Sequence, residues 1–421
     1  MTERTKAAGT FNVKIIPDGN VVSARGYSVN SLRAGIKPSA SKSDMAMIVS
    51  EKAATYVGTF TRNLVKAAPV ERDSKIMNEK GIAEAVVINT GIANAATGKT
   101  GLEACEKTAA AAGKALGILP ERILTASTGV IGMQLPVEKL ENGAAELAKN
   151  LKKDSESAHK AANAILTTDT HSKEIAVEFT IGKKTCIIGA MCKGSGMIHP
   201  NMGTMLGFLM SDVAIEHDIA LKALRSVVDK TFNMVSVDGD TSTNDTVILM
   251  CNGMAGNVKI TEENEDYEIF KEALTVVAEY LAKNIAKDGE GATRLFTANV
   301  KGAKDYETAK ILAKSIITSN LSKAAIFGKD ANCGRLFCAM GYSGADFKPE
   351  KTDIWIESVN GSIKLVENGA VMEFSEEKAL EILSPDEITA VCDVKDGNFE
   401  AVAWGCDLTY DYVKINADYR S

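Results

Sequence analysis

Residues 173–191, KEIAVEFTIGKKTCIIGAM, contain the clearest indication of the fold class. Apolar side chains occupy alternate positions on both sides of the sequence GKK at 182–184, first at Ile175, Val177, Phe179 and Ile181 and then at Cys186, Ile188 and Ala190. A period of two residues is typical of a β-strand, and a glycine between two such runs favours a tight turn. The sequence therefore predicts a β-hairpin with one buried face.

Helical and strand patterns alternate on both sides of this hairpin. Helical spacing of apolar residues, or a run of small residues after a strand, predicts helices over 101–116, 136–151, 155–166, 219–232 and 267–285. Strands are predicted over 85–89, 246–251, 295–300, 353–357 and 401–404. Because hairpins outnumber clear β–α–β units, we expect an α+β fold of mixed or antiparallel sheets with packed helices.

The composition is typical of a globular protein. The 421 residues are 45% hydrophobic and 24% charged, with 48 Lys and Arg, 55 Asp and Glu, and a net charge of −7. Because the chain is acidic and has no basic stripe, we expect no binding to nucleic acid. No apolar run reaches the length of about 18 residues that a membrane span needs. The eight scattered cysteines and the absence of an apolar leader favour a cytoplasmic protein with reduced thiols.

Two segments resemble ligand-binding loops without meeting their requirements. Residues 93–100, ANAATGKT, match a relaxed phosphate loop, but Ala93 replaces a glycine, so a β–α turn with a capped helix is favoured. Residues 238–245 begin like a calcium loop, but the twelfth position is Leu249 and not the bidentate Glu. The four histidines share no ligand spacing. We therefore expect no metal or bound cofactor, and a structured polar loop near a site at 238–245.

A nucleophile that works without histidine fits the sequence better. No G-x-S-x-G elbow occurs, and isolated histidines give a Ser-His-Asp triad little support. A threonine can use its own α-amino group as the base, since that amine titrates at about 7.7–8.0, but the chain must then be cut before the threonine. Residues 193–206, KGSGMIHPNMGTML, contain such a bond at Gly203-Thr204. From these residues alone, an ordinary glycine-rich connection remains an open alternative.

Several motifs in this order resemble the ornithine acetyltransferase (glutamate N-acetyltransferase) family over nearly the whole chain. The matching segments are 50–52 (SEK), 60–63 (FTRN), 89–98 (NTGIANAATG), 127–132 (STGVIG), 167–170 (TTDT), 193–206, 288–293 (DGEGAT) and 416–421 (NADYRS). The resemblance also argues against a phosphate loop at 93–100. It implies an N-terminal-nucleophile-like, self-cleaving acyltransferase of arginine biosynthesis.

The resemblance implies that the precursor cuts itself between Gly203 and Thr204. An α chain (1–203) would then contain the oxyanion hole and a substrate-binding lysine, and a β chain (204–421) would begin with the nucleophile Thr204. The acetyl group would pass from N²-acetylornithine to Thr204 and then to glutamate, with ping-pong kinetics. The oxyanion hole would consist of the Thr128 hydroxyl and the Gly129 backbone N–H.

For substrate binding the family implies a set drawn from both halves of the chain: Thr167, Lys193, Thr204, Glu290, Asn416 and Ser421. Lys193 suits an α-carboxylate, and Glu290 suits the cationic side chain of ornithine. The family also implies a heterotetramer of two α and two β chains. Whether acetyl-CoA is a second acetyl donor stays open, since no residue decides it. Two other functions also stay open, namely a related N-terminal-nucleophile amidase or aminopeptidase, and a small-molecule-binding protein that never matures.

Overall fold

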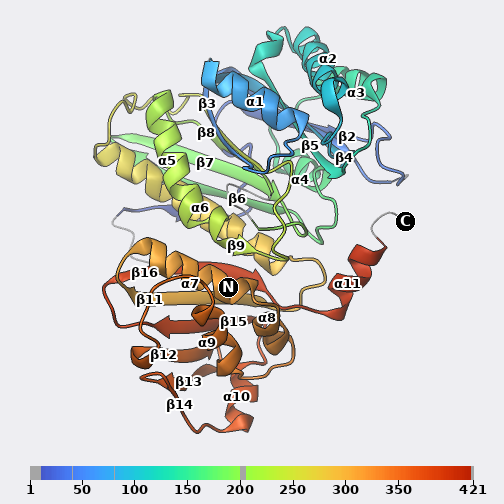
Figure 1. Cartoon of the computed structure of the whole chain (residues 1–421). Coiled ribbons are helices and arrows are strands. Elements are labelled where there is room, and N and C mark those ends of the chain that lie inside the picture. The colour runs from blue at the N-terminus through green and yellow to red at the C-terminus, as the bar shows by residue number, and fades with distance from the viewer. Residues whose placement is uncertain (1–10, 40, 80, 200–204, 419–421) are drawn as a thin grey trace.

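The computed structural model describes residues 11–39, 41–79, 81–199 and 205–418 (Figure 1). These residues form two mixed β-sheets with helices packed against them, one sheet in the upper half of Figure 1 and one in the lower half. The predicted α+β class is confirmed. None of the helices that the structure describes has the length and apolar content needed to cross a bilayer.

The first sheet has the strand order β1-β6-β7-β8-β10-β3-β4-β5, with β2 paired to β3. Its strands are β1 (Lys14–Ile15), β2 (Tyr27–Leu32), β3 (Met45–Phe60), β4 (Ile82–Ile92), β5 (Ile123–Val130), β6 (Lys173–Ile181), β7 (Lys184–Lys193), β8 (Leu206–Ser211) and β10 (Thr246–Cys251). The helices of this half are α1 (Ala68–Glu79), α2 (Gly98–Leu116), α3 (Val137–Lys149), α4 (Ser155–Ala164), α5 (His217–Lys230) and α6 (Glu265–Lys287), with a short 3₁₀ turn at Pro120–Arg122.

The hairpin predicted from 173–191 is β6 and β7, paired antiparallel with Val177 opposite Ile188. The expectation of a single buried face is wrong for its inner part, because every residue of β7 from Ile188 to Lys193 is buried. Helix α6 covers one face, where Phe179 contacts Phe270 with ring centroids 6.4 Å apart. Met191 packs on the other face in a cluster that includes residues of α4. A strand covered on both faces loses the alternation that marks a half-exposed one.

Strand β8 lies between β7 and β10 and joins segments that are distant in the sequence. It pairs antiparallel with β7, with Leu206 opposite Lys193, and parallel with β10, with Leu206 opposite Thr246. Strand β10 in turn pairs with β3. Two strands that follow the predicted cleavage site are thus enclosed by strands that precede it. A cut before Thr204 would leave two chains that share one sheet.

The second sheet has the order β14-β13-β12-β15-β11-β16-β9. Its strands are β9 (Val235–Ser236), β11 (Leu295–Ala303), β12 (Asp353–Ser358), β13 (Gly361–Glu367), β14 (Ala370–Val371), β15 (Glu387–Asp393) and β16 (Phe399–Cys406). The helices of this half are α7 (Tyr306–Thr318), α8 (Asn320–Phe327), α9 (Cys333–Gly341), α10 (Glu376–Ile382) and α11 (Tyr410–Ala417), with 3₁₀ turns at Phe232–Met234 and Pro349–Lys351. Helix α6 packs against strands of both sheets, so a continuous apolar core joins the two halves.

The turn at 93–97 connects β4 to α2, as expected in preference to a phosphate loop. The expected cap is wrong, because the Thr97 side chain makes no capping hydrogen bond to the first turn of α2. Its hydroxyl instead donates to Asn94 Oδ1 at 2.8 Å, and Asn94 Nδ2 donates to the Gly101 carbonyl at 3.0 Å. A capping residue normally has an extended backbone, but Thr97 has φ −108° and ψ −1°, and its side chain is directed to Asn94 and not to the first turn of α2.

Candidate active site

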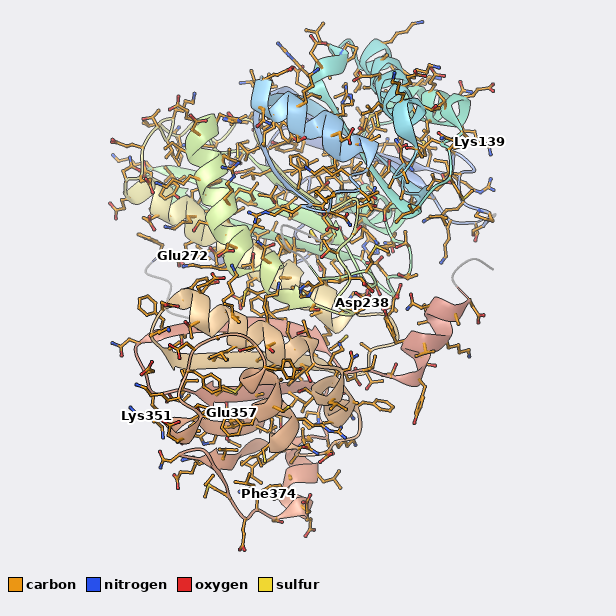
Figure 2. All side chains as sticks on the ribbon, in the orientation of Figure 1. Lys139, Asp238, Glu272, Lys351, Glu357 and Phe374 are labelled. Carbon is orange, nitrogen blue, oxygen red and sulfur yellow. The ribbon has the colours of Figure 1, made fainter. Side chains whose placement is uncertain are left out.

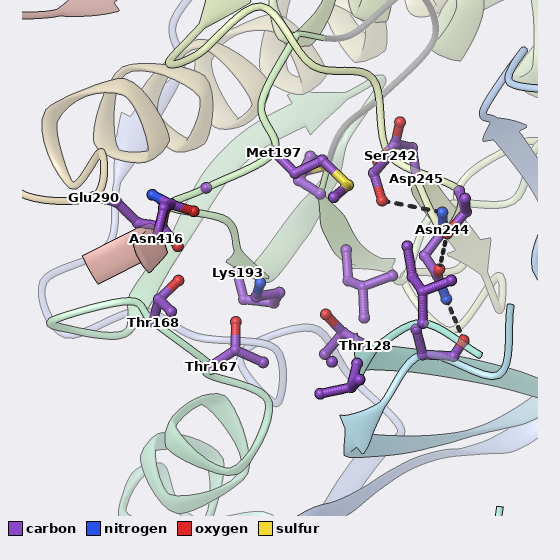
Figure 3. Close-up of a pocket in the computed structure, with 18 residues that line it drawn as sticks. Thr128, Thr167, Thr168, Lys193, Met197, Ser242, Asn244, Asp245, Glu290 and Asn416 are labelled. Carbon is purple, nitrogen blue, oxygen red and sulfur yellow. Dashed lines mark hydrogen bonds between the residues drawn. The ribbon is translucent and has the colours of Figure 1, made fainter. Parts of the chain in front are cut away.

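A cavity of about 310 Å³ lies where β5 and β7 end and β8 and β10 begin (Figure 3). Its lining comes from eight separate stretches of the chain and consists of Ala93, Thr128, Gly129, Val130, Ile131, Thr167, Thr168, Lys193, Gly196, Met197, Met205, Leu206, Ser242, Thr243, Asn244, Asp245, Glu290 and Asn416. Figure 3 shows Thr128, Thr167 and Lys193 directed toward the same space, with Glu290 and Asn416 to one side.

Six of the residues expected at the site line this one cavity, namely Thr128, Gly129, Thr167, Lys193, Glu290 and Asn416. Gly203, Thr204 and Ser421 lie outside the described residues. Met205, which directly follows Thr204 in the chain, also lines the cavity, and its carbonyl accepts the Thr246 N–H at 2.9 Å. The structure thus brings together the described members of the expected set.

Thr128 and Gly129 lie near the end of β5, beside β4, where Gly129 pairs with Gly91. Gly129 has φ 134°, a backbone angle that residues with a side chain rarely adopt. A Cβ on this glycine would lie 2.2 Å from the carbonyl carbon of Gly91, so the backbone approach requires glycine. The Thr128 hydroxyl points into the cavity (Figure 3). Two potential hydrogen-bond donors therefore belong to one rigid strand end.

Lys193, the last residue of β7, presents a cation at the cavity. Its side chain is 9% exposed, and its Nζ lies 3.6 Å from Asp169 Oδ2. Burial alone would raise the pKa of Asp169, but the neighbouring Lys193 and Lys173 and the Gly194 N–H lower it more, so the pKa lies well below its usual range. Asp169 is therefore a carboxylate at any physiological pH.

Glu290 and Asn416 line the side of the cavity away from Lys193 (Figure 3), where Glu290 supplies a carboxylate. Asn416 Nδ2 donates to Glu290 Oε2 at 2.8 Å, and the Glu290 backbone N–H donates to the Ser195 carbonyl at 3.0 Å. A Cβ on Gly196 would lie 2.2 Å from the carboxyl carbon of Glu290, so glycine permits this approach. None of the residues of α11, all of which the structure describes, is buried, yet the helix places Asn416 at the site.

The segment that leads to the expected cleavage site is held by Asp238, which lies at the junction of the two halves in Figure 2. Its carboxylate accepts the backbone N–H of Met197 at 2.6 Å and that of Ile198 at 2.9 Å. Met197 has φ 54°, a backbone conformation that non-glycine residues seldom adopt. Hydrogen bonds to the half-buried carboxylate of Asp238 offset that strain.

The model of the ArgJ family matches residues 28–421. This chain belongs to the ArgJ family. It is 48% identical over 406 residues to the arginine biosynthesis bifunctional protein ArgJ of Caldanaerobacter subterraneus subsp. tengcongensis, covering 96% of this chain and 100% of that protein. The protein of the same name from Bacillus subtilis is 44% identical over 403 residues, covering 96% and 97%. The solved ornithine acetyltransferase of Mycobacterium tuberculosis complexed with ornithine is 32% identical, covering 45% of this chain and 100% of that one, with a TM-score of 0.42.

Membership of the ArgJ family confirms the expectation drawn from the motifs, and with it the class of enzyme, an acyltransferase of arginine biosynthesis. Sequence reasoning missed individual residues of the polar loop that closes the cavity of this ArgJ-family chain. Ser242, Thr243, Asn244 and Asp245 line the cavity. Asn244 Nδ2 donates to the carbonyls of Ala93 and Ser127 at 2.6 and 2.7 Å and so joins this loop to the turn after β4 and to strand β5. The polar run at 238–245 was expected to be a loop near a site. It is a loop, and residues 242–245 line the cavity, but the run carried no signal for these contacts.

Proposed function

We propose that this ArgJ-family enzyme transfers the acetyl group of N²-acetylornithine to glutamate through an acetyl ester on Thr204. The observation that carries the proposal is the cavity beside Met205. A lysine, a glutamate and two potential oxyanion donors from separate segments all line it. The names of relatives at 44–48% identity, which place them in arginine biosynthesis, support the same reaction.

The first step of the proposal is self-cleavage of the precursor. The Thr204 hydroxyl attacks the Gly203 carbonyl carbon, the peptide C–N bond breaks, and the acyl group moves from nitrogen to oxygen. Water then hydrolyses this ester, which leaves a carboxylate on Gly203 and frees both the hydroxyl and the α-amino group of Thr204. The enclosed position of β8 and β10 between β7 and β3 supports two chains that remain together after the cut.

The second step is acetyl transfer. The Thr204 hydroxyl attacks the acetyl carbonyl, and the α-amine of Thr204 accepts the proton and returns it to the leaving amine of ornithine. A free α-amino group ordinarily has a pKa of about 7.7–8.0, which suits it to this role. The amine of glutamate then attacks the acetyl ester and regenerates the free hydroxyl. The Thr128 hydroxyl and the Gly129 N–H stabilise the oxyanion of each tetrahedral intermediate, and loss of one such donor costs about 10²–10³ in kcat.

Substrate recognition follows from the two charged sides of the cavity. Lys193 binds the α-carboxylate, and Glu290, oriented by Asn416, binds the ammonium of the ornithine side chain. Thr167 and Ser421 complete the proposed contacts, and the αβ pairs assemble further into a heterotetramer. The cycle needs no bound cofactor, and acetyl-CoA enters only as an alternative acetyl donor.

The test combines intact-mass analysis with an acetyl-transfer assay on the purified wild-type protein. We expect two fragments, residues 1–203 and 204–421, and acetylglutamate formed from acetylornithine and glutamate with parallel double-reciprocal plots. Omitting glutamate distinguishes transfer from hydrolysis to acetate, and replacing acetylornithine with acetyl-CoA tests the second donor. Full turnover by a single uncut chain would contradict the proposal.

A further inference from the structure

Asp169 is a buried carboxylate with four partners, two backbone N–H groups and two lysine side chains. Its side chain is fully buried, and it lies in the turn that precedes β6. Oδ1 accepts the Gly194 backbone N–H at 2.6 Å and Lys173 Nζ at 2.8 Å. Oδ2 accepts the Thr167 backbone N–H at 3.1 Å and lies 3.6 Å from Lys193 Nζ. One side chain thus contacts two cavity-lining residues and the first glycine of the segment that leads toward Thr204.

The charges continue behind Asp169. Lys173, which is fully buried, lies 2.6 Å from Asp288 Oδ2, and Asp288 also accepts the backbone N–H and the hydroxyl of Thr170. The Ser195 hydroxyl donates to the Asp288 carbonyl at 2.6 Å. Positive and negative groups therefore alternate from Lys193 inward. Buried charges are tolerated when each is paired and hydrogen-bonded, so this row keeps Asp169 ionised without contact with water.

We propose that Asp169 is a positioning residue for substrate binding: it acts through Lys193 and Thr167 and holds both where they meet the carboxylate of the substrate. The inference rests on the proposed function, which assigns that carboxylate to Lys193. At 3.6 Å the contact between Lys193 and Asp169 is looser than the two ion pairs of Lys173. The Lys193 ammonium is therefore oriented by Asp169 while its N–H donors remain available to a ligand.

The second sheet offers a matched control. Asp353, at the start of β12, is also buried, forms ion pairs with Lys395 at 2.7 Å and Lys364 at 2.9 Å, and accepts the Asn368 N–H at 2.7 Å. It has two lysine partners, as Asp169 does, and one backbone donor where Asp169 has two, but its lysines do not line the cavity. Asp353→Asn therefore removes a similar buried charge without touching Lys193 or Thr167.

The test measures ornithine binding by isothermal titration calorimetry on the full mature protein, because ornithine carries no acetyl group and no turnover can occur. Asp169→Asn is expected to weaken binding at least about tenfold. In the Lys193→Ala background the same substitution should weaken binding by a clearly smaller factor, because the route through Lys193 is gone and only the route through Thr167 remains. Asp169→Glu, which keeps the charge, should retain part of the affinity, and Asp353→Asn should bind ornithine as the wild type does.

Equal weakening by Asp169→Asn in both backgrounds would overturn the inference, since a merely structural role is additive, and so would wild-type affinity in Asp169→Asn. If that variant does not fold, Asp169→Glu with and without Lys193→Ala gives the same decision. If the wild-type enzyme binds ornithine and transfers acetyl groups, but the effects of Asp169→Asn and Lys193→Ala on affinity are additive, only this inference fails. If the wild-type protein neither binds ornithine nor transfers acetyl groups, the proposed function and this inference both fail.

Discussion

Each half of the molecule pairs a buried aspartate with two lysines, but only one of these clusters contributes a lysine to the cavity. In the first sheet, Asp169 joins Lys173 to Lys193, and Lys193 lines the cavity. In the second sheet, Asp353 holds Lys364 and Lys395 in a cluster confined to β12, β13 and the turn after β15. A buried aspartate paired with two lysines therefore does not by itself indicate function. The first cluster differs in that one of its lysines, Lys193, also lines a cavity that a ligand can fill.

The largest expected effect is at the start of the segment that enters β8. Thr204→Ala should abolish both self-cleavage and acetyl transfer, because the hydroxyl is the nucleophile of both proposed steps. Intact-mass analysis and an acetylglutamate assay measure the two losses. Thr204→Ser should keep both activities in part. The control Thr297→Ala, in β11 of the second sheet, should still be cleaved and active. Acetyl transfer by Thr204→Ala would contradict the assignment of Thr204 as the nucleophile.

The oxyanion donors give the next largest effect. Thr128→Val keeps the shape of the side chain but removes the hydroxyl that points into the cavity, so kcat should fall about 10²–10³-fold with little change in KM. Steady-state kinetics with acetylornithine and glutamate measure this. Thr128→Ser, which retains a hydroxyl, should lose less. A rise in KM with kcat unchanged would assign Thr128 to substrate binding and not to the oxyanion.

A matched pair of lysines compares the two charge clusters directly. Lys193→Ala should raise KM for acetylornithine about 10–100-fold and change kcat much less, because it removes a charged hydrogen bond to the substrate carboxylate. Lys364→Ala removes a lysine from the cluster of Asp353 and should leave KM unchanged. The same steady-state assay serves both variants, and an unchanged KM in Lys193→Ala would count against its role.

The smallest effect is a loss of stability in the second sheet. Burial raises the pKa of Asp353, but Lys395, the Asn368 N–H and Lys364 lower it more, to about 2. A carboxyl whose pKa is depressed on folding stabilises the protein above its unfolded pKa of about 3.9, and this contribution is lost as the pH falls from about 4 to 2. Asp353→Asn should therefore lower the free energy of unfolding by about 1–3 kcal/mol at pH 7.

Denaturant unfolding at pH 7 and pH 3 checks this prediction, with acetyl transfer as the control readout. The difference between wild type and Asp353→Asn should be smaller at pH 3, and KM should be the same for both proteins at pH 7. A constant difference at the two pH values would mean that the charge of Asp353 does not contribute in the way its partners indicate.

Much of the fold could be predicted because local patterns report local burial. The strand expected at 246–251 is β10, and the helix expected over 267–285 lies within α6. The errors have a common cause. The inner half of β7 is covered on both faces, and the Thr97 side chain is directed to the buried Asn94 and not to its helix. In both places contacts with other buried groups override the local pattern.

For the site, the motifs named residues but could not show how they meet. Lys193 and Glu290 are separated by almost a hundred positions, and only the pairing of β7 with β8 and the packing of α6 bring them to one cavity. The contribution of Asp169 was not predictable from its motif, because its importance comes from four partners that meet only in the folded chain.

The amino-acid sequence by itself determined the α+β class, the family and the bond expected to break, because periodicity, glycine placement and ordered motifs are properties of short segments. Only the tertiary structure decided that β8 and β10 lie inside a sheet built from both halves, and that one buried carboxylate serves two residues of the cavity. The reason is physical: strand order and buried ion pairs depend on hydrogen bonds and charges between residues far apart in the chain, and no local pattern encodes which of them will meet.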